Sequence, residues 1–234
     1  VLGGGSMRAG ADALLKKVET IGRMIGDKSI PRRLESVLNP NQVNSGERLV
    51  TIGASAGGPA ALAVLLGGLP KDFTAAVVVV QHVDVQFAAG MAEWLGTTSR
   101  LPVPLAREGG RPTPGVVMLA GTNDHLVLNE NGSFAYTPNP REYVYRPSVD
   151  VFFQSVTRHW SGRTIGVLLT GMGRDGAVGL KALRNQGHHT IVQDESSSAV
   201  YGMPKAAVTL GAAVDVLPLD EIAGKLIAKV SAGR

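Results

Sequence analysis

The hydrophobic residues beyond position 47 fall into short runs that are separated by polar, glycine-rich or proline-containing segments. Six of these runs have strand length, and they are Leu49–Ile52, Ala75–Val80, Val116–Ala120, Ile165–Leu169, Thr190–Val192 and Ala213–Leu217. Most of the runs are continuously apolar, without the alternation of a strand that faces water on one side. Continuous runs are typical of strands that are covered on both faces. The pattern therefore predicts a mainly parallel sheet between two layers of helices.

Helical patterns fill most of the intervals between the predicted strands. The predicted helices are Ala60–Leu66, Phe87–Leu95, Val149–His159, Ala177–Gln186 and Pro204–Leu210. Alternation of strands with helices indicates βαβ units. One segment differs, because Leu126–Leu128 and Phe134–Tyr136 flank Asn131-Gly132, a pair that suits the positive φ angles of a type I′ turn. We expect an α/β fold with a small antiparallel hairpin.

The first 46 residues have a different character. Gly3-Gly4-Gly5-Ser6 has the composition of a flexible linker, and Ala11–Ile25 shows the apolar stripe of an amphipathic helix. Residues 31–46 contain Pro31, Asn39-Pro40-Asn41 and Asn44-Ser45-Gly46, which are typical of a polar connector. We expect residues 1–46 to form an N-terminal helix and linker, and residues 47–234 to form one folded domain.

Composition excludes several classes of function. The chain of 234 residues contains no cysteine, so it can form neither a disulfide framework nor a thiolate metal site. It lacks an apolar run of the roughly 18–20 residues that a membrane-spanning helix needs. Its formal charge of +4 is spread along the sequence and does not indicate a nucleic-acid surface. We expect a cytoplasmic protein without membrane insertion or nucleic-acid binding.

Ser55 lies in the segment Gly53-Ala54-Ser55-Ala56-Gly57, between a predicted strand and a predicted helix. A Gly-x-Ser-x-Gly turn at such a junction presents the serine hydroxyl at an exposed bend, because the flanking glycines avoid steric clash. The motif alone fits two hypotheses, a serine nucleophile and a phosphate-binding turn.

Two further candidates follow other predicted strands. His82 follows the run that begins at Ala75, and Asp175 follows Ile165–Leu169 within a glycine-rich turn. Because the carboxyl ends of parallel strands meet at one edge of the sheet, the three residues can form a triad. Ser55 would attack, His82 would accept its proton, and Asp175 would orient the imidazole. For Asp175 taken alone, an N-cap of the helix from Ala177 is an equally good interpretation.

An acyl-transfer reaction also needs donors for the oxyanion. The backbone amides of Ala56 and Met172 lie in the two glycine-rich turns and are the candidates. Arg146, Arg174 and Lys205 lie near the same loops and could attract an acidic partner, although ordinary solvated charge is the simpler interpretation for each one.

Two other classes of function remain open at this point. One is a nucleotide- or phosphate-binding module, although Gly53–Gly58 lacks the Lys-Ser/Thr ending of a Walker loop. The other is a catalytically silent adaptor. The remaining histidines form no convincing metal set, so we assign neither a metal nor a cofactor.

Several spaced motifs strengthen the hydrolase hypothesis and point to a family. They are Ile52-Gly53-Ala54-Ser55-Ala56-Gly57-Gly58-Pro59, Gln81-His82-Val83, Arg146-Pro147-Ser148-Val149-Asp150, Leu169-Thr170-Gly171-Met172-Gly173-Arg174-Asp175-Gly176-Ala177, Gln193-Asp194-Glu195-Ser196-Ser197 and Gly202-Met203-Pro204-Lys205-Ala206-Ala207. From about Leu49 to Leu219 the chain resembles the catalytic domain of the bacterial chemotaxis protein-glutamate methylesterases, which can also act as receptor glutamine deamidases. The resemblance implies a doubly wound sheet, with Ser55, His82 and Asp175 as nucleophile, base and acid.

The resemblance also implies a substrate and a partner. The substrate would be a glutamate γ-methyl ester on the cytoplasmic helices of a methyl-accepting chemoreceptor. Family members usually carry an N-terminal receiver domain, for which residues 1–46 are too short, so we expect it to be absent from this chain. Four residues depart from the family pattern: Ala56 where threonine is common, Tyr145 where histidine is frequent, and His188-His189 in place of small residues.

Overall fold

The fold is built on one six-stranded parallel sheet. The computed structural model describes residues 47–232, so the predicted N-terminal helix and linker lie outside the described residues. The strand order is β3-β2-β1-β6-β7-β8. The strands are β1 Arg48–Ala54, β2 Ala76–Gln81, β3 Val117–Leu119, β6 Arg163–Leu168, β7 His189–Gln193 and β8 Asp215–Leu217. All neighbouring pairs are parallel, which confirms the prediction from the continuous apolar runs.

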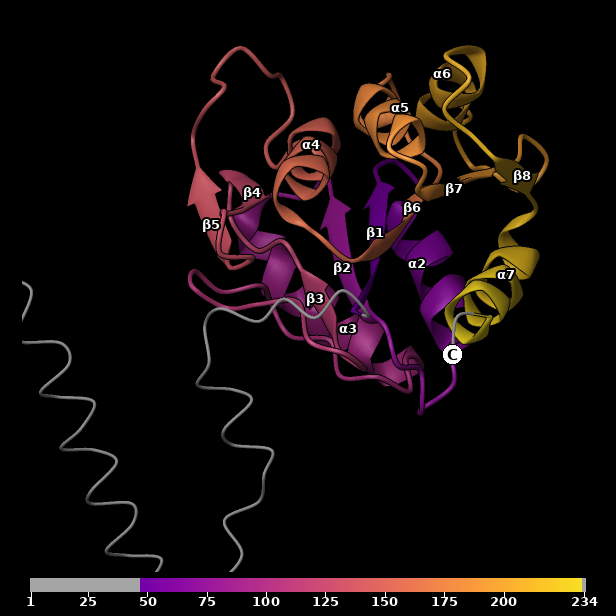
Figure 1. Ribbon diagram of the computed structural model, residues 1–234, viewed down its shortest axis with the longest axis horizontal. Helices are drawn as coiled ribbons and strands as arrows, with labels where there is room; N and C mark the ends of the chain where they lie inside the picture. The colour runs from indigo at the N-terminus through magenta and orange to yellow at the C-terminus, as the bar shows by residue number, and fades with distance from the viewer. Residues whose placement is uncertain (1–46, 233–234) are drawn as a thin grey trace, which may run out of the picture. The chain divides into compact units, whose positions relative to one another are not determined.

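Helices cover both faces of this sheet (Figure 1). Helices α2 (Gly58–Gly67), α3 (Val85–Thr98) and α7 (Leu219–Ser231) lie on one face. Helices α4 (Val149–His159), α5 (Ala177–Asn185) and α6 (Met203–Thr209) lie on the other. The strands therefore sit between two apolar clusters, and the predicted α/β class with helices on both faces is confirmed.

Successive residues of the central strand β1 are buried alternately in the two apolar clusters. Val50 and Ile52 are buried in the cluster beneath α2 and α7, and Leu49 is buried in the cluster beneath α4 and α5. Full burial on both sides leaves no position in β1 for a polar face toward water. The central strand is thus a rigid support for the residue that follows it.

The direction in which strands are added reverses between β1 and β6. The chain passes from β1 outward to β2 and β3, and later from β6 outward to β7 and β8. Open α/β sheets bind ligands at the carboxyl ends of the strands beside such a reversal. Ser55 follows β1 and Asp175 follows β6, so two of the predicted catalytic residues flank this point.

The predicted hairpin is present, but the type of its turn was predicted wrongly. Strands β4 (His125–Leu128) and β5 (Phe134–Thr137) pair in antiparallel fashion as a separate two-stranded sheet. Gly132 has φ 75°, whereas no non-glycine residue has a positive φ in the described part of the chain. Asn131 therefore cannot adopt the type I′ geometry. Instead, its side-chain oxygen accepts hydrogen bonds from the Ser133 amide and hydroxyl.

Helix α7 was absent from the predicted elements. Its apolar positions Ile222, Ala223, Leu226 and Val230 are buried at helical spacing. Asp220 and Glu221 lie in its first turn, where acidic residues favour the positive end of the helix dipole. The apolar spacing and the acidic first turn are therefore the sequence signals that indicate this helix. Within residues 47–232, no helix is both long and apolar enough to cross a membrane.

Candidate active site

The carboxyl edge of the sheet brings the Asp175 carboxylate and the His82 imidazole together. Nε2 of His82 lies 2.7 Å from Oδ2 of Asp175. The two residues are 93 positions apart in the sequence. Both side chains are largely buried, with 9% of the His82 side chain and 6% of the Asp175 side chain exposed. The structure therefore joins two of the three residues that the strand-end argument selected.

Asp175 is held from several directions by hydrogen-bond donors at the start of helix α4. The Ser148 hydroxyl donates to Oδ1 at 2.8 Å, the Val149 amide to Oδ2 at 2.7 Å, and the Asp150 amide to Oδ1 at 3.0 Å. The amide of Gly176 adds a fourth bond. Helix N-termini attract anions because their first amides have no intrahelical acceptor. The carboxylate is therefore fixed in position before any substrate arrives.

The alternative interpretation of Asp175, as the N-cap of the following helix, is wrong. Helix α5 has Gly176 at its N-cap position, with φ 88° and no side-chain capping bond. The side chain of Asp175 is directed instead to the N-terminus of another helix, α4. The true N-cap of α4 is Ser148, whose hydroxyl accepts from the Val151 amide while it donates to Asp175.

These contacts determine the ionisation of Asp175. Burial would raise the pKa of its carboxyl, but the hydrogen bonds from His82, the Asp150 amide and Ser148 outweigh it, so the pKa is lowered. A carboxylate that accepts several hydrogen bonds remains ionised even when it is desolvated. At neutral pH Asp175 is therefore the charged acceptor that His82 needs.

The contact with Asp175 also determines which nitrogen of His82 is free. An ionised carboxylate accepts a hydrogen bond, so Nε2 of His82 carries the proton and Nδ1 is left as an acceptor. Nδ1 is buried and has no hydrogen-bond partner among the described residues. In the familiar serine proteases the aspartate binds Nδ1 and Nε2 faces the serine, so the ring here is turned the other way round.

Ser55 sits beside His82 at the ends of adjacent strands. The last paired residues of β1 and β2 are Ala54 and Gln81, and the next residues along the two strands are Ser55 and His82. The Gln81 side-chain amide donates to the carbonyls of both Ser55 and His82, at 2.9 and 3.0 Å. Within residues 47–232 the Ser55 hydroxyl forms no hydrogen bond with His82. The Gln81 side chain therefore connects the ends of the two strands.

The turn that carries Ser55 depends on close approaches that only glycine permits. Gly57 has φ 77°, in the left-handed region. A Cβ atom on Gly171 would lie 2.9 Å from Cβ of Ser55 and 2.2 Å from the sulfur of Met203. The Ser55 amide donates to the Thr170 carbonyl at 3.0 Å, which binds the serine turn to the loop after β6. The glycine-rich loops thus bring the two turns into contact.

The predicted oxyanion donors have unoccupied amides. In the described part of the chain neither the Ala56 amide nor the Met172 amide donates a hydrogen bond to another residue. Ala56 precedes the N-terminal end of α2, and the Met172 side chain is 66% exposed at the rim of the site. Both turns therefore retain a donor for an incoming oxygen atom.

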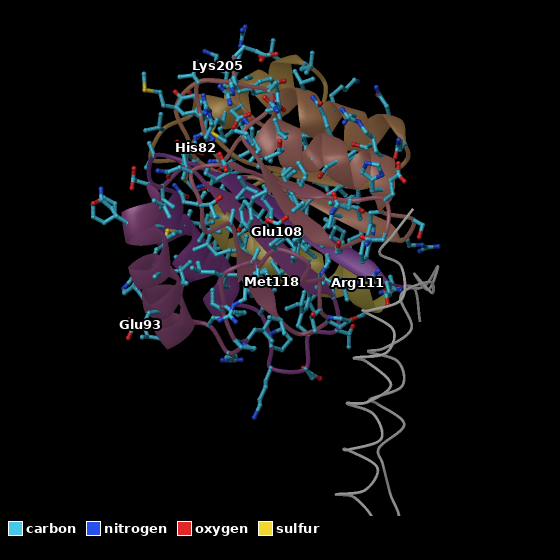
Figure 2. The ribbon with its side chains drawn as sticks, turned by 90° about the vertical axis from the view of Figure 1, so that its left-hand side faces the viewer. His82, Glu93, Glu108, Arg111, Met118 and Lys205 are labelled. Atoms are coloured by element: carbon cyan, nitrogen blue, oxygen red, sulfur yellow. The ribbon has the colours of Figure 1, made fainter. Side chains whose placement is uncertain are left out.

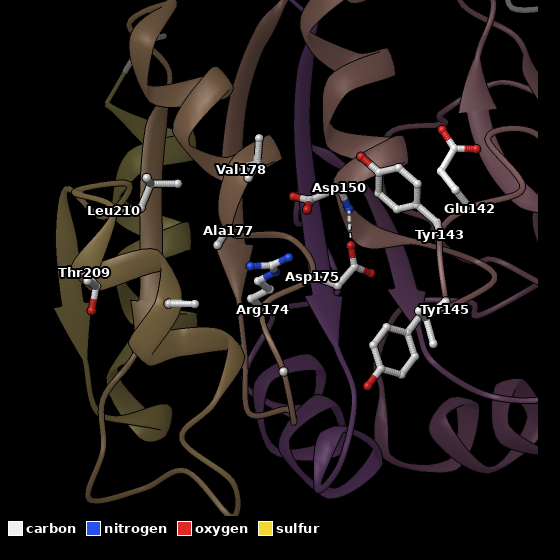
Figure 3. Close-up of a pocket in the computed structure, with 13 residues that line it drawn as sticks. Glu142, Tyr143, Tyr145, Asp150, Arg174, Asp175, Ala177, Val178, Thr209 and Leu210 are labelled. Carbon is white, nitrogen blue, oxygen red and sulfur yellow. Dashed lines mark hydrogen bonds between the residues drawn. The ribbon is translucent and has the colours of Figure 1, made fainter.

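A groove of about 790 Å³ opens beside Asp175 (Figure 3). Tyr143 and Tyr145 lie on one side of it, and Val178 and Leu210 lie on the other. Its volume is in the range of sites that take a small ligand or a side chain. Most of its lining is apolar, and of the three predicted catalytic residues Asp175 alone belongs to that lining.

The three predicted substrate-binding cations occupy different places around the site. Arg174 lines the groove and lies beside Asp175 in Figure 3. Arg146 lies in a smaller hollow with His82, and its guanidinium donates to the Arg141 carbonyl. Lys205 is exposed on α6 (Figure 2) and lines neither hollow. The structure therefore places two of the three cations at the opening of the site.

Tyr145 covers the imidazole of His82. The two ring centroids are 4.3 Å apart and the ring planes differ by 8°, which is a stacked arrangement. The sequence identifies Tyr145 as a departure from the family pattern but does not indicate where its side chain lies. No local signal predicts this contact, because the loop that carries Tyr145 is 63 positions beyond His82 in the sequence.

His125 contacts Ser148, the residue whose hydroxyl binds Asp175. Its Nδ1 accepts a hydrogen bond from the Ser148 amide at 3.0 Å, and its Nε2 donates to the Pro140 carbonyl at 3.2 Å. Burial lowers the pKa of His125, so the imidazole is neutral at physiological pH. From the sequence, His125 has no predicted role in the site, because the contact joins residues that are 23 positions apart in the sequence.

Asp150 is a second buried carboxyl, and its environment differs from that of Asp175. It accepts a hydrogen bond from the Gly179 amide at 2.7 Å. Burial raises the pKa of Asp150 to about 6, and the nearby charge of Asp175 adds to this rise. Asp150 thus takes up a proton in a pH range where Asp175 stays ionised. No group of three or more potential ligands could hold a metal ion within residues 47–232.

A buried aspartate–histidine pair beside a serine turn, at the carboxyl edge of a doubly wound sheet, is an arrangement typical of serine hydrolases. Comparison with known proteins identifies the family. A family model described as CheB methylesterase matches residues 50–226. The chain therefore belongs to the CheB methylesterase family.

Individual relatives agree with this assignment. "Protein-glutamate methylesterase/protein-glutamine glutaminase 2" of Cupriavidus metallidurans is 58% identical over 224 residues, which cover 96% of this chain and 66% of the relative. A relative of the same type from Pseudomonas fluorescens is 57% identical over 226 residues, which cover 97% of this chain and 67% of that protein. The chain spans about two thirds of the length of these relatives.

The fold agrees as well. The crystal structure of the Thermotoga maritima CheB methylesterase catalytic domain superposes with a TM-score of 0.75 at 38% sequence identity. The match covers 80% of this chain and 100% of the other. The predicted family resemblance is confirmed.

The raised pKa of Asp150 predicts an effect on stability. A raised pKa means that the folded state holds the proton more tightly than the unfolded state, whose carboxyl titrates near pH 4. The stabilising contribution of this proton is present below about pH 4 and is lost as the pH rises through about 6. Asp150→Asn keeps an oxygen for the Gly179 amide and does not titrate. We expect its unfolding free energy to rise relative to wild type by about 1–3 kcal/mol between pH 4 and pH 7.5.

Urea unfolding at both pH values measures this difference. Asp72→Asn is the matched control, because Asp72 is exposed in the loop before β2. A difference between Asp150→Asn and wild type that is the same at pH 4 and pH 7.5 would show that Asp150 does not titrate in this way.

Proposed function

We propose that this protein hydrolyses glutamate γ-methyl esters on bacterial chemoreceptors, with Ser55, His82 and Asp175 as the catalytic triad. The observation that carries the proposal is the buried pair of His82 and Asp175 beside the Ser55 turn. The names of the relatives, which combine glutamate methylesterase with glutamine glutaminase, support the choice of substrate. Their second activity suggests that receptor glutamines are deamidated at the same site.

The first half of the reaction forms a covalent intermediate. The Ser55 hydroxyl turns toward Nδ1 of His82, gives up its proton there, and attacks the ester carbonyl carbon. Asp175 stabilises the imidazolium that results, because it remains ionised and bound to Nε2. The negative charge on the carbonyl oxygen is stabilised by the amides of Ala56 and Met172. His82 then protonates the departing methoxide, and methanol leaves.

The second half regenerates the enzyme. A water molecule gives a proton to Nδ1 of His82 and attacks the glutamyl ester of Ser55, and the serine leaves with the proton that His82 returns. The product is a free glutamate side chain. A glutamine substrate passes through the same intermediate, with ammonia in place of methanol. Neither half requires a metal or an organic cofactor.

The groove beside Asp175 supports binding of a helical segment. Val178, Leu210 and Tyr145 offer it an apolar surface, and Arg174 and Arg146 offer it positive charge. These cations, together with Lys205 on α6, would attract the acidic face of a receptor helix. Since the methylated helices of chemoreceptors lie in the cytoplasm, we propose that this protein acts there.

Replacement of the nucleophile tests the proposal most simply. Ser55→Ala removes the attacking oxygen, so release of methanol from a methylated receptor fragment should fall by about 10³-fold or more. Ser161→Ala is the matched control, because Ser161 is exposed beyond the end of α4, at the opposite edge of the sheet. Demethylation by Ser55→Ala at the wild-type rate would disprove the assignment of Ser55, whereas a wild type that releases no methanol would favour the adaptor alternative.

The stacked ring of Tyr145 makes a second prediction. Tyr145→Phe keeps the aromatic face against His82, whereas Tyr145→Ala removes it. Since an aromatic stacking contact is worth about 0.5–1.5 kcal/mol, we expect Tyr145→Ala to lower kcat/KM by about 2- to 10-fold. Tyr145→Phe should stay close to wild type. The same methanol-release assay compares the variants, and equal activity of the Ala and Phe variants would show that the stack does not contribute.

A further inference from the structure

The edge of the sheet opposite to the candidate active site carries a second hollow. It has a volume of about 580 Å³ and lies where β1, β6 and β7 begin. The strands of this sheet are six or seven residues long at its centre, so the hollow lies roughly 20 Å from the triad. It is therefore separate from the site already described.

The titratable side chains that line this hollow are all basic. They come from five helices and strands and from the loop before β7, and they are Arg48, Arg163, Arg184, His188, His189 and Lys229. No aspartate or glutamate lines the hollow. The domain as a whole is not basic, because across residues 47–232 the lysines and arginines are equal in number to the aspartates and glutamates. The concentration of cations at this place is therefore local.

These cations are also not neutralised by neighbours. Among the described residues Arg48, Arg163, Arg184 and Lys229 form no ion pair with a carboxylate. Asp215, which binds His189 at 2.7 Å and Lys225 at 3.0 Å, is already shared between two partners. Four permanent positive charges around one hollow repel one another. An anion inside the hollow would remove this repulsion.

The fold holds part of this basic lining in place. Arg184 donates to the carbonyls of Gly211 and Ala213, which fixes its guanidinium at the wall of the hollow. His188 is half-buried, and burial lowers its pKa, so it offers a neutral imidazole to a ligand at physiological pH. The hydroxyl of Thr164, in the same wall, is buried and has no partner within residues 47–232. The wall thus combines fixed charges with neutral polar groups.

We propose that this hollow is a binding site for a small anion with several negative charges, of the oligophosphate class. The arginine fork matches phosphate oxygens in pairs, and several arginines suit a ligand with several phosphate groups. The hollow has the volume of a small-molecule site, which favours a compact ligand over the flat surface of a protein. The segment of residues 1–46 is a poor occupant, since it is itself basic in composition.

The site explains a sequence feature to which the catalytic function assigns no role. His188 and His189 replace small residues of the family pattern, and both line the hollow. Their position at the start of β7 is far from the triad and gives them no part in ester hydrolysis. The proposal does not depend on the proposed function, because none of its residues belongs to the candidate active site.

Calorimetric titration with sodium tripolyphosphate tests the proposal on the whole chain. Ionic strength is matched with sodium chloride throughout, since screening alone weakens unspecific attraction. We expect saturable binding to the wild type and at least about tenfold weaker binding to the double variant Arg163→Gln/Lys229→Gln, because each substitution removes a charged hydrogen-bond donor for the phosphate oxygens. The matched control is Arg100→Gln/Arg107→Gln, two exposed cations on the β3 side of the sheet.

A second measurement on the wild type covers the case of a variant that fails to fold. The imidazole NMR signals of His188 and His189 should move as tripolyphosphate is added, while those of His82 and His125 stay in place. Absence of saturable binding, equal weakening in the control variant, or movement of the His82 signals alone would overturn the proposal. Tighter binding of a polyglutamate peptide than of tripolyphosphate would overturn the oligophosphate class and favour an acidic protein segment.

Discussion

The position of the Asp175 carboxylate at the start of helix α4 is the contact on which the candidate active site depends. Two amides of that helix and the hydroxyl of its N-cap, Ser148, donate to the carboxylate. They offset the cost of burying a charge, so Asp175 remains ionised and can hold Nε2 of His82. A helix on one side of the sheet thus sets the orientation of a base that follows a strand 93 residues away from its acid.

Other residues around Asp175 either support this contact or are affected by it. Ser148 is itself positioned by His125, whose neutral ring accepts from its amide. Asp150, the next acid along α4, keeps a raised pKa of about 6 because it is buried beside Asp175. The two neighbouring carboxyls therefore differ in pKa, because Asp175 accepts more hydrogen bonds than Asp150. The loops from β1 and β6 complete the site, with glycines where the chains come closest.

Much of this arrangement could be predicted from the sequence, because it follows from strand ends. Continuous apolar runs predicted the parallel sheet, and a parallel sheet brings Ser55, His82 and Asp175 to one edge. The contacts around them could not be predicted in this way. Local pattern fitted Asp175 equally well as a cap of its own helix, whereas the observed partner is α4, and only tertiary packing decides between the two. The stack of Tyr145 on His82 and the cations gathered from β1, β6, α5 and α7 are likewise products of packing between distant segments.

The central claim is that Asp175 turns His82 so that Nδ1 is the base that faces Ser55. Nitrogen-15 NMR of histidine-labelled protein tests this claim directly, with the His82 signals assigned by comparison with His82→Gln. At a pH where the imidazole is neutral, the account predicts a proton on Nε2 and none on Nδ1. A proton on Nδ1 with a bare Nε2 would contradict it, because Asp175 would then have no hydrogen bond to accept from the ring.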